Sequence, residues 1–149
     1  MAEGQKIAIA SDHAGFQLKA AVIAHLQKSG HTVIDLGPAN EDRVDYPDFG
    51  FKLAESLRAG EAPLGIAICG SGIGISVAVN RYKDMRCALV HDATSARLAR
   101  SHNDANVLAL GARLIGPEVA IECVNVFLST AFEGGRHADR LQKLGKCGA

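Results

Sequence analysis

The sequence lacks a net charge, a long apolar run and closely spaced cysteines. Its 16 lysine and arginine residues balance 16 aspartate and glutamate residues, so no global attraction to nucleic acid or to anionic membranes is expected. No apolar run is long enough to cross a bilayer. Residues 1–6 lead straight into a strand-like segment and lack the regions of a signal peptide. We therefore expect a cytoplasmic protein that binds neither nucleic acid nor membrane.

The four cysteines, Cys69, Cys87, Cys123 and Cys147, lie far apart and form no Cys-x-x-Cys pair. This spacing argues against a zinc site and against a framework of disulfides, so no metal ligand is predicted. Cys87 lies in a strand-like segment and Cys123 in an apolar helical stretch. Both are interpreted as buried packing residues, because a free cysteine packs as a small hydrophobic side chain.

Strand-like and helix-like segments alternate along the 149 residues, a length that suits one domain, residues 1–149. The expected strands are 6–11, 31–36, 64–69, 86–90 and 105–110. The expected helices are 16–29, 48–57 with Asp48 as its cap, 72–82, 93–101, 117–131 and 136–144. This alternation implies an α/β fold, a five-stranded parallel sheet with helices on both faces and a final C-terminal helix. Ligands of such folds bind at the carboxyl ends of the strands.

The most informative segment joins an apolar strand to a glycine-rich turn, in the order Ile66-Ala67-Ile68-Cys69-Gly70-Ser71-Gly72-Ile73-Gly74. The small residues expose backbone N–H groups at the start of a helix. Such a turn can hold an anion, and the thiol of Cys69 lies at its edge. The turn alone leaves three roles for this thiol: nucleophile, base or packing residue.

Three common phosphate-binding motifs fail on their spacing. A P-loop requires lysine where Ser71 stands. The dinucleotide fingerprint requires a third glycine where Ile75 stands, and a cysteine phosphatase loop requires arginine at the same position. ATP hydrolysis, NAD binding and phosphatase chemistry are therefore disfavoured.

Polar side chains follow other expected strands as well. Asp12 and His13 come directly after the first strand, although Asp12 is also an ordinary helix cap. Tyr46 lies in the loop after the second strand, and Arg113 follows the fifth. Because ligands bind at the carboxyl ends of parallel strands, these residues join Cys69 as candidates for one site.

Histidine, asparagine and arginine residues occur near two helix ends. His102 and Asn103 lie in a run of turn-forming residues, where a histidine is more often structural than catalytic. Arg136 and Arg140, on either side of His137, are four residues apart and share one helical face. Two guanidinium groups suit a phosphate, but a solvated basic face has the same spacing. Spacing alone leaves both interpretations open.

Five of these motifs occur in a characteristic order. They are Ser11-Asp12-His13-Ala14-Gly15, Asp45-Tyr46-Pro47-Asp48-Phe49, Cys69-Gly70-Ser71-Gly72-Ile73-Gly74, Ser101-His102-Asn103-Asp104-Ala105-Asn106-Val107-Leu108 and Phe132-Glu133-Gly134-Gly135-Arg136-His137. Together they closely resemble ribose-5-phosphate isomerase type B, of the family that includes the galactose-6-phosphate isomerase subunits. Each motif alone is a weak signal, whereas five in order over nearly the whole chain are highly specific.

The resemblance implies a reversible conversion of ribose 5-phosphate to ribulose 5-phosphate through an enediolate, without a metal or organic cofactor. It also implies a three-layer Rossmann-like fold. The expected assembly is a homodimer with active sites at the interface, paired into tetramers in some members.

Catalytic roles follow from the resemblance position by position. Cys69 is expected to be the base that moves the proton between C1 and C2. His102 is expected to assist ring opening, with Asn103 beside it. Ser71 stands where the family has Thr or Ser near the sugar oxygens. Backbone N–H groups for the enediolate are expected from the turn Gly70 to Gly74, namely Gly70, Ser71, Gly72, Ile73 and Gly74. Some members use a glutamate further along this turn, where this chain has Ile75, so it resembles the cysteine type.

The resemblance also implies how the rest of the substrate is held. Asp12 and His13 are expected to line the pocket, with Tyr46 at its wall. The phosphate is expected among basic side chains, namely Arg113, Arg136, His137 and Arg140.

Three other functions remain open from the sequence. An isomerase of a six-carbon sugar phosphate, such as allose or galactose 6-phosphate, would use the same motifs. A non-catalytic sugar-phosphate binding module would bind without moving a proton. A thiol hydrolase is disfavoured, because no acyl-enzyme architecture is evident.

Overall fold

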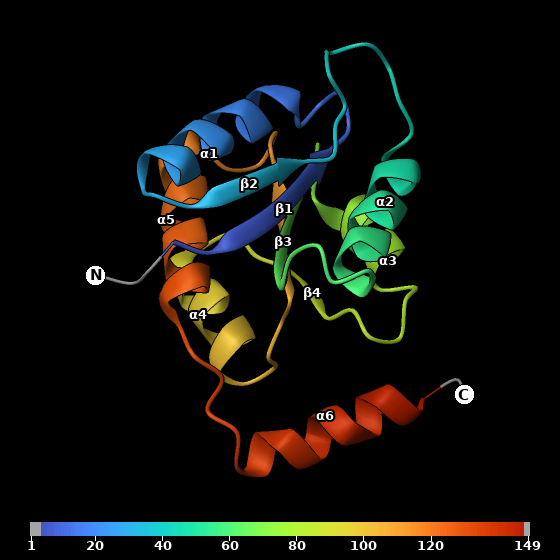
Figure 1. Ribbon diagram of the computed structural model, residues 1–149, viewed down its shortest axis with the longest axis vertical. Coiled ribbons are helices and arrows are strands. Elements are labelled where there is room, and N and C mark those ends of the chain that lie inside the picture. The colour runs from blue at the N-terminus through green and yellow to red at the C-terminus, as the bar shows by residue number, and fades with distance from the viewer. Residues whose placement is uncertain (1–3, 148–149) are drawn as a thin grey trace.

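Strands and helices alternate through the computed structural model, which describes residues 4–147 (Figure 1). The strands are β1 (Lys6–Ser11), β2 (Thr32–Asp35), β3 (Leu64–Cys69), β4 (Cys87–Leu89) and β5 (Val107–Gly111). The helices are α1 (Phe16–Lys28), α2 (Tyr46–Arg58), α3 (Ile73–Val79), α4 (Ala93–Ser101), α5 (Pro117–Ser129) and α6 (Arg136–Lys146). The predicted α/β class is confirmed.

All strand pairs in the sheet are parallel, and the strand order is β2-β1-β3-β5-β4. The chain moves outward from β1 to β2 and then returns to β3 on the other side of β1. The order therefore reverses between β1 and β3, where ligands of such sheets bind beyond the strand ends. Ser11 pairs with Ile68 in the register of these strands. The turns that begin at Asp12 and after Cys69 consequently lie side by side.

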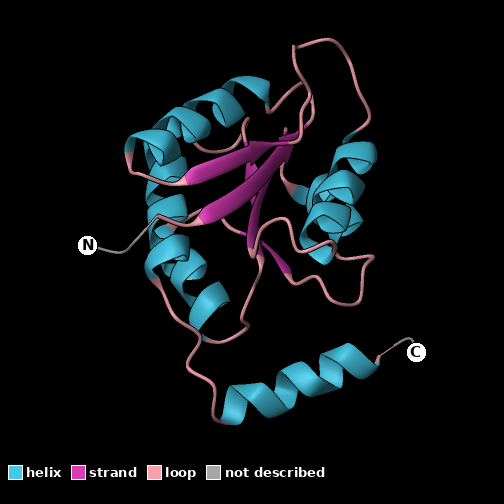
Figure 2. Cartoon of the chain, viewed as in Figure 1, coloured by secondary structure: helices cyan, strands magenta, loops and turns pink. Residues whose placement is uncertain are grey.

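Helices cover both faces of the sheet, with α1, α4 and α5 on one face and α2 and α3 on the other (Figure 2). In β3, Ile66 and Ile68 face the first group, whereas Ala67 and Cys69 face the second. Successive side chains of a strand point to opposite faces, so the Ile-Ala-Ile-Cys pattern directs the thiol toward α2 and α3. Each fully buried isoleucine contributes about 1.5–3 kcal/mol through removal of apolar surface from water.

Helix α6 stands apart from the two helical layers (Figure 1). His137 is its one buried side chain among the described residues, and Leu144 near its end is 59% exposed. No helix within residues 4–147 combines the length and the apolar character that crossing a membrane requires.

Some predicted bounds were wrong for local reasons. Helix α2 begins at Tyr46, with Asp45 at the capping position. Asp48, the predicted cap, instead lies in the first turn, after Pro47, a residue that suits the start of a helix. Helix α3 ends at Val79 rather than at residue 82, because the chain turns tightly there. Strand β5 begins at residue 107 rather than 105, since the Ala105 N–H bonds back to the end of α4. Most other bounds differ by a residue or two.

Candidate active site

The turn after β3 places the sulfur of Cys69 beside the first residues of α3. Cys69 ends the strand and is 4% exposed. Gly72 N–H donates a hydrogen bond to its Sγ at 3.1 Å, and Ile73 N–H donates to Ser71 Oγ at 3.1 Å. The turn therefore directs one N–H group at the sulfur, and the N–H groups of Gly70, Ser71 and Gly74 have no acceptor within residues 4–147.

Two glycines in this turn are required by close approaches. Gly72 has a left-handed φ of 77°, and a Cβ there would lie 2.5 Å from Leu89 Cδ1 and 2.9 Å from the carbonyl carbon of Leu110. A Cβ on Gly74 would lie 2.5 Å from Cε1 of Tyr46. The tyrosine ring thus lies against the glycine, and no side chain larger than hydrogen fits between them.

A cavity of about 520 Å³ opens at this turn. Its lining combines strand ends and the start of α3, namely Asp12, Tyr46, Cys69, Gly70, Ser71, Ile73, Gly74, Arg113 and Leu114. Arg113 N–H donates to the Gly70 carbonyl at 2.9 Å, and its guanidinium lies against Gly70. The volume falls within the range of small-molecule sites.

Asp12 and His13 differ in their relation to the cavity. Asp12 is 7% exposed, and its Oδ1 accepts a hydrogen bond from Gly15 N–H at 3.0 Å. Asp12 lines the cavity, and its hydrogen bond also fixes the turn before α1. His13 is not among the cavity-lining residues, and its Nδ1 lies 3.2 Å from the backbone of Val44. This contact ties the first turn to the loop before α2.

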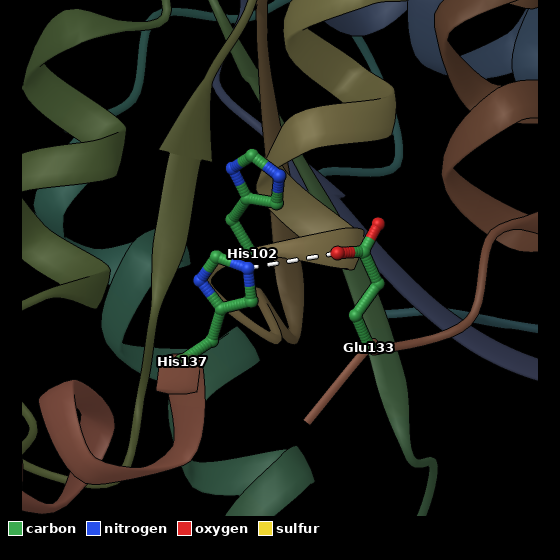
Figure 3. A group of neighbouring side chains, drawn as sticks. All are labelled: His102, Glu133 and His137. Carbon is green, nitrogen blue, oxygen red and sulfur yellow. Dashed lines mark ion pairs between the residues drawn. The ribbon is translucent and has the colours of Figure 1, made fainter. Parts of the chain in front are cut away.

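A second cluster contains His102, Glu133 and His137 (Figure 3). His102 caps the end of α4, and His137 lies in the first turn of α6. Their rings stack with centroids 4.4 Å apart and an interplanar angle of 15°. Glu133 Oε1 lies 3.5 Å from His137 Nε2. Residues distant in sequence thus bring two imidazoles and a carboxylate together.

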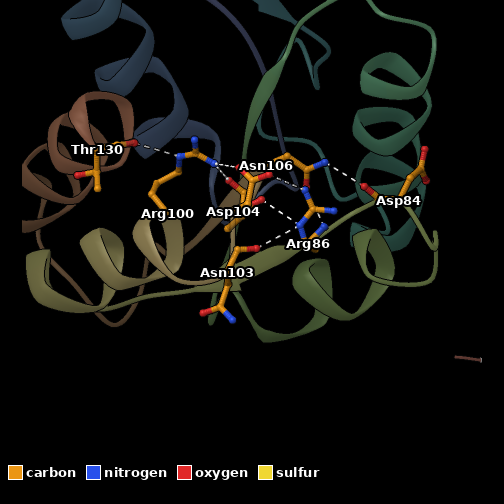
Figure 4. A network of polar contacts seen from close by, with 8 residues as sticks. Asp84, Arg86, Arg100, Asn103, Asp104, Asn106 and Thr130 are labelled. Carbon is orange, nitrogen blue, oxygen red and sulfur yellow. Dashed lines mark hydrogen bonds and ion pairs between the residues drawn. The ribbon is translucent and has the colours of Figure 1, made fainter. Parts of the chain in front are cut away.

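A polar network holds the turn that follows His102 (Figure 4). Arg100 Nη1 donates to Asp104 Oδ1 at 2.9 Å and to the Ala105 carbonyl at 2.8 Å. Arg86 Nε donates to the carbonyls of Asp104 and Asn103, at 3.0 and 3.2 Å. Asp104 has a left-handed φ of 46°, a conformation that aspartate tolerates better than most residues. The network therefore fixes the backbone that carries His102 and Asn103.

One chain does not bring all the predicted site residues together. His102, Asn103, Arg136, His137 and Arg140 do not line the Cys69 cavity. Arg136 and Arg140 are exposed on α6. Asn103 instead lines a larger cavity of about 670 Å³, which also contains Leu144 of α6. The predicted residues thus form a Cys69 group and a His102 group.

The remaining cysteines differ in their surroundings. Cys87 is half-buried beside the larger cavity, not buried as predicted, yet desolvation still raises its pKa to about 12. Burial is also the main cause that raises the pKa of Cys123 to about 11, with smaller contributions from Asp92 and Glu122. Cys147 is exposed. Cys87 and Cys123 therefore remain protonated near neutral pH and do not act as nucleophiles.

Sequence reasoning missed several residues around the site. Asp104 lay inside a quoted motif, and its spacing of four from Arg100 is a recognisable helical ion-pair signal. Glu133 likewise lay close to the predicted Arg136 and His137. No short-range pattern in the sequence indicates that it approaches His102. Leu114 adjoins Arg113 and reaches the cavity because of the turn after β5.

A family model described as Ribose/Galactose Isomerase matches residues 7–144. The chain belongs to this family. It is 50% identical over 139 residues to a Mycoplasma pneumoniae protein named probable ribose-5-phosphate isomerase B, with 93% of this chain and 91% of that protein covered. Its fold also matches solved members of the family.

A ribose-5-phosphate isomerase B structure from Thermotoga maritima superposes with a TM-score of 0.94 at 51% identity, over 95% of this chain and 98% of that chain. The Mycoplasma genitalium ribose-5-phosphate isomerase B with bound ribulose 5-phosphate superposes with a TM-score of 0.90 at 41% identity, over 97% of both chains.

Proposed function

We propose that this protein interconverts ribose 5-phosphate and ribulose 5-phosphate through a cis-enediolate. The observation that carries the proposal is the buried Cys69 sulfur, 3.1 Å from Gly72 N–H at a cavity that also contains Arg113. Membership of the isomerase family and the solved relative with bound ribulose 5-phosphate support it.

In the proposed reaction Cys69 acts as a thiolate base. It removes the proton from C2 of the open-chain aldose, and the electron pair of that bond forms the enediolate. The same proton returns to C1, while the O2 hydroxyl loses its proton and O1 gains one. The enediolate oxygens accept hydrogen bonds from Ser71 and Gly74 N–H, which have no partner within the described residues. Each such preorganised donor contributes about 3–4 kcal/mol to an oxyanion transition state.

Ring opening requires a second proton-transfer group, and we assign it to His102. Imidazole titrates near neutrality and can take the proton of the anomeric hydroxyl while the ring oxygen gains one. Because His102 does not line the Cys69 cavity of its own chain, the proposed active unit is a homodimer. The second copy supplies His102 and Asn103 to the cavity.

The apolar surface around the cavity favours this dimer. Tyr46, Ile73, Val77 and Leu114 are 42%, 54%, 50% and 57% exposed. Three of them line the cavity, and Val77 lies one helical turn from Ile73. Exposed apolar side chains gathered at one place are typical of a protein interface. A second copy that covers them would also exclude water from the proton transfer.

The substrate phosphate is assigned to basic side chains at the edge of the composite site. Arg113 borders the cavity within its own chain. Arg136 and Arg140 are exposed on α6 and would come from the partner with His137. Their contacts hold the sugar so that C2 meets the sulfur, and the phosphate itself does not react.

The decisive test is an assay of the purified protein on ribose 5-phosphate in the presence of EDTA. We expect ribulose 5-phosphate to form and solvent deuterium to enter the substrate at C2. Binding without exchange would favour the non-catalytic module. A higher kcat/KM on allose or galactose 6-phosphate than on ribose 5-phosphate would replace the substrate with a six-carbon one.

A further inference from the structure

The cluster of His102, Glu133 and His137 is built like a metal site. Its three ligand atoms lie within 4.8 Å of one another. Two imidazoles and one carboxylate are the protein ligands of a well-known class of zinc sites, in which a fourth position stays open. The cluster lies outside the Cys69 cavity of its own chain, although two of its members, His102 and His137, are also assigned to the proposed composite site.

The backbone holds these three residues close together. Glu133 N–H donates to the carbonyl of Ser101 at 3.0 Å, which fixes the segment before α6 against the end of α4. His137 N–H donates to the Gly134 carbonyl at 3.1 Å, and the His137 side chain is 6% exposed. His137 is therefore the fixed ligand, whereas Glu133 is exposed and His102 is half-buried.

The ligand atoms need only small movements to meet one ion. Donor atoms of a tetrahedral zinc site lie about 3.4 Å apart, given zinc–nitrogen and zinc–oxygen distances near 2.1 Å. Because the two imidazole planes differ by only 15°, one ring must turn to aim its nitrogen at a shared ion. His102 and Glu133 have the room to make this movement, since neither side chain is packed in the core.

We propose that His102, Glu133 and His137 bind one divalent transition-metal ion of the zinc type per chain. Imidazole and carboxylate ligands suit this class of ion. The ion would join the end of α4 to the start of α6, two elements that otherwise meet through few side chains. It would also occupy the His102 imidazole, so that zinc inhibits the isomerase. The binding itself does not depend on the proposed function, whereas the inhibition does.

The test is a calorimetric titration of Zn²⁺ into the metal-free, full-length protein. We expect one ion per chain and a rise in the thermal midpoint with added zinc. Glu133→Gln and His137→Gln are each expected to weaken zinc binding by at least about tenfold. Because His137 is buried, circular dichroism must show that its variant is folded. Glu133 is exposed, so Glu133→Gln decides the question if His137→Gln unfolds.

Two variants control for other ligands. His91→Gln removes an exposed histidine outside the cluster, and Cys147→Ser removes the exposed thiol. Both are expected to bind zinc as the wild type does. Wild-type affinity in folded Glu133→Gln would overturn the proposal, and so would loss of the ion in Cys147→Ser.

Inhibition is measured separately on each variant against its own metal-free activity. We expect the zinc concentration that halves activity to follow the calorimetric affinity and to rise at least about tenfold in Glu133→Gln. A protein that binds zinc at this site but has no isomerase activity would refute the proposed function and leave the metal site standing.

Discussion

Cys69 unites three properties at the residue scale: burial, an N–H donor to its sulfur, and a place on the cavity wall. Cys69→Ala is expected to lower kcat by about 10²–10⁴-fold, because it removes the proposed base. Binding of ribulose 5-phosphate, measured by calorimetry, is expected to persist. Cys147→Ser is the matched control, and full activity in Cys69→Ala would refute the assignment.

His102 is expected to matter most for cyclic substrate. His102→Asn removes the imidazole proposed to transfer the proton but retains a polar side chain of similar reach. We expect a far larger loss of kcat/KM on ribose 5-phosphate than on an open-chain analogue that needs no ring opening. Equal losses on both substrates would remove His102 from that role.

The raised pKa values of Cys87 and Cys123 predict a pH dependence of stability. In the folded chain the pKa values of Cys87 and Cys123 are raised from 9.0 to about 12 and about 11. The folded state thus retains these protons more tightly than the unfolded state. Their contribution to the free energy of unfolding is fully present below about pH 9 and is lost as the pH rises through 11 and 12.

Urea unfolding at pH 8 and pH 10 should reveal a lower free energy of unfolding at pH 10. A Cys123→Ala variant should lose part of this slope, and an unchanged slope would contradict the assignment.

At the scale of elements, the turn between α4 and β5 depends on Asp104. It accepts from Arg100 and adopts a left-handed φ. Asp104→Ala is expected to lower the free energy of unfolding by about 1–3 kcal/mol, since alanine is strained there and the arginine loses an acceptor. Asp104→Asn should retain most of the stability, because asparagine tolerates this backbone conformation.

The same pair of variants tests whether this turn positions His102. If it does, Asp104→Ala lowers activity on cyclic ribose 5-phosphate more than on the open-chain analogue, and Asp104→Asn restores the ratio. A uniform loss on both substrates would mean that Asp104 supports stability alone. Thermal melting of each variant separates the two effects.

At the scale of the whole molecule, the separation of Cys69 from His102 predicts complementation between subunits. Cys69→Ala and His102→Asn are each expected to be poorly active. If the site is shared by two chains, equal mixtures refolded together form hybrid dimers, and about one quarter of all sites become intact. Activity near that fraction of wild type would support the shared site. No recovery, with hybrid dimers confirmed by native mass spectrometry, would contradict it.

The sequence by itself determined the local structure of the Cys69 turn and the residue types that this turn presents. The alternation of strands and helices follows from hydrophobic periodicity and from glycine and proline signals, which act over a few residues. The Ile-Ala-Ile-Cys pattern likewise decides which face of β3 carries the thiol. The order of five motifs was enough to indicate the family.

Only the tertiary structure decided which of these segments meet. The strand order, which sets Asp12 beside Cys69, depends on packing between residues far apart in the chain. The approach of Glu133 and His137 to His102 depends on contacts between segments far apart in the chain, among them the bonds from Glu133 N–H to the Ser101 carbonyl and from Arg100 Nε to the Thr130 carbonyl. Helix α6 packs little against its own chain, so its distance from the Cys69 cavity could not be predicted from local signals. Local propensity and periodicity are encoded residue by residue, whereas these juxtapositions arise from the burial of one surface against another.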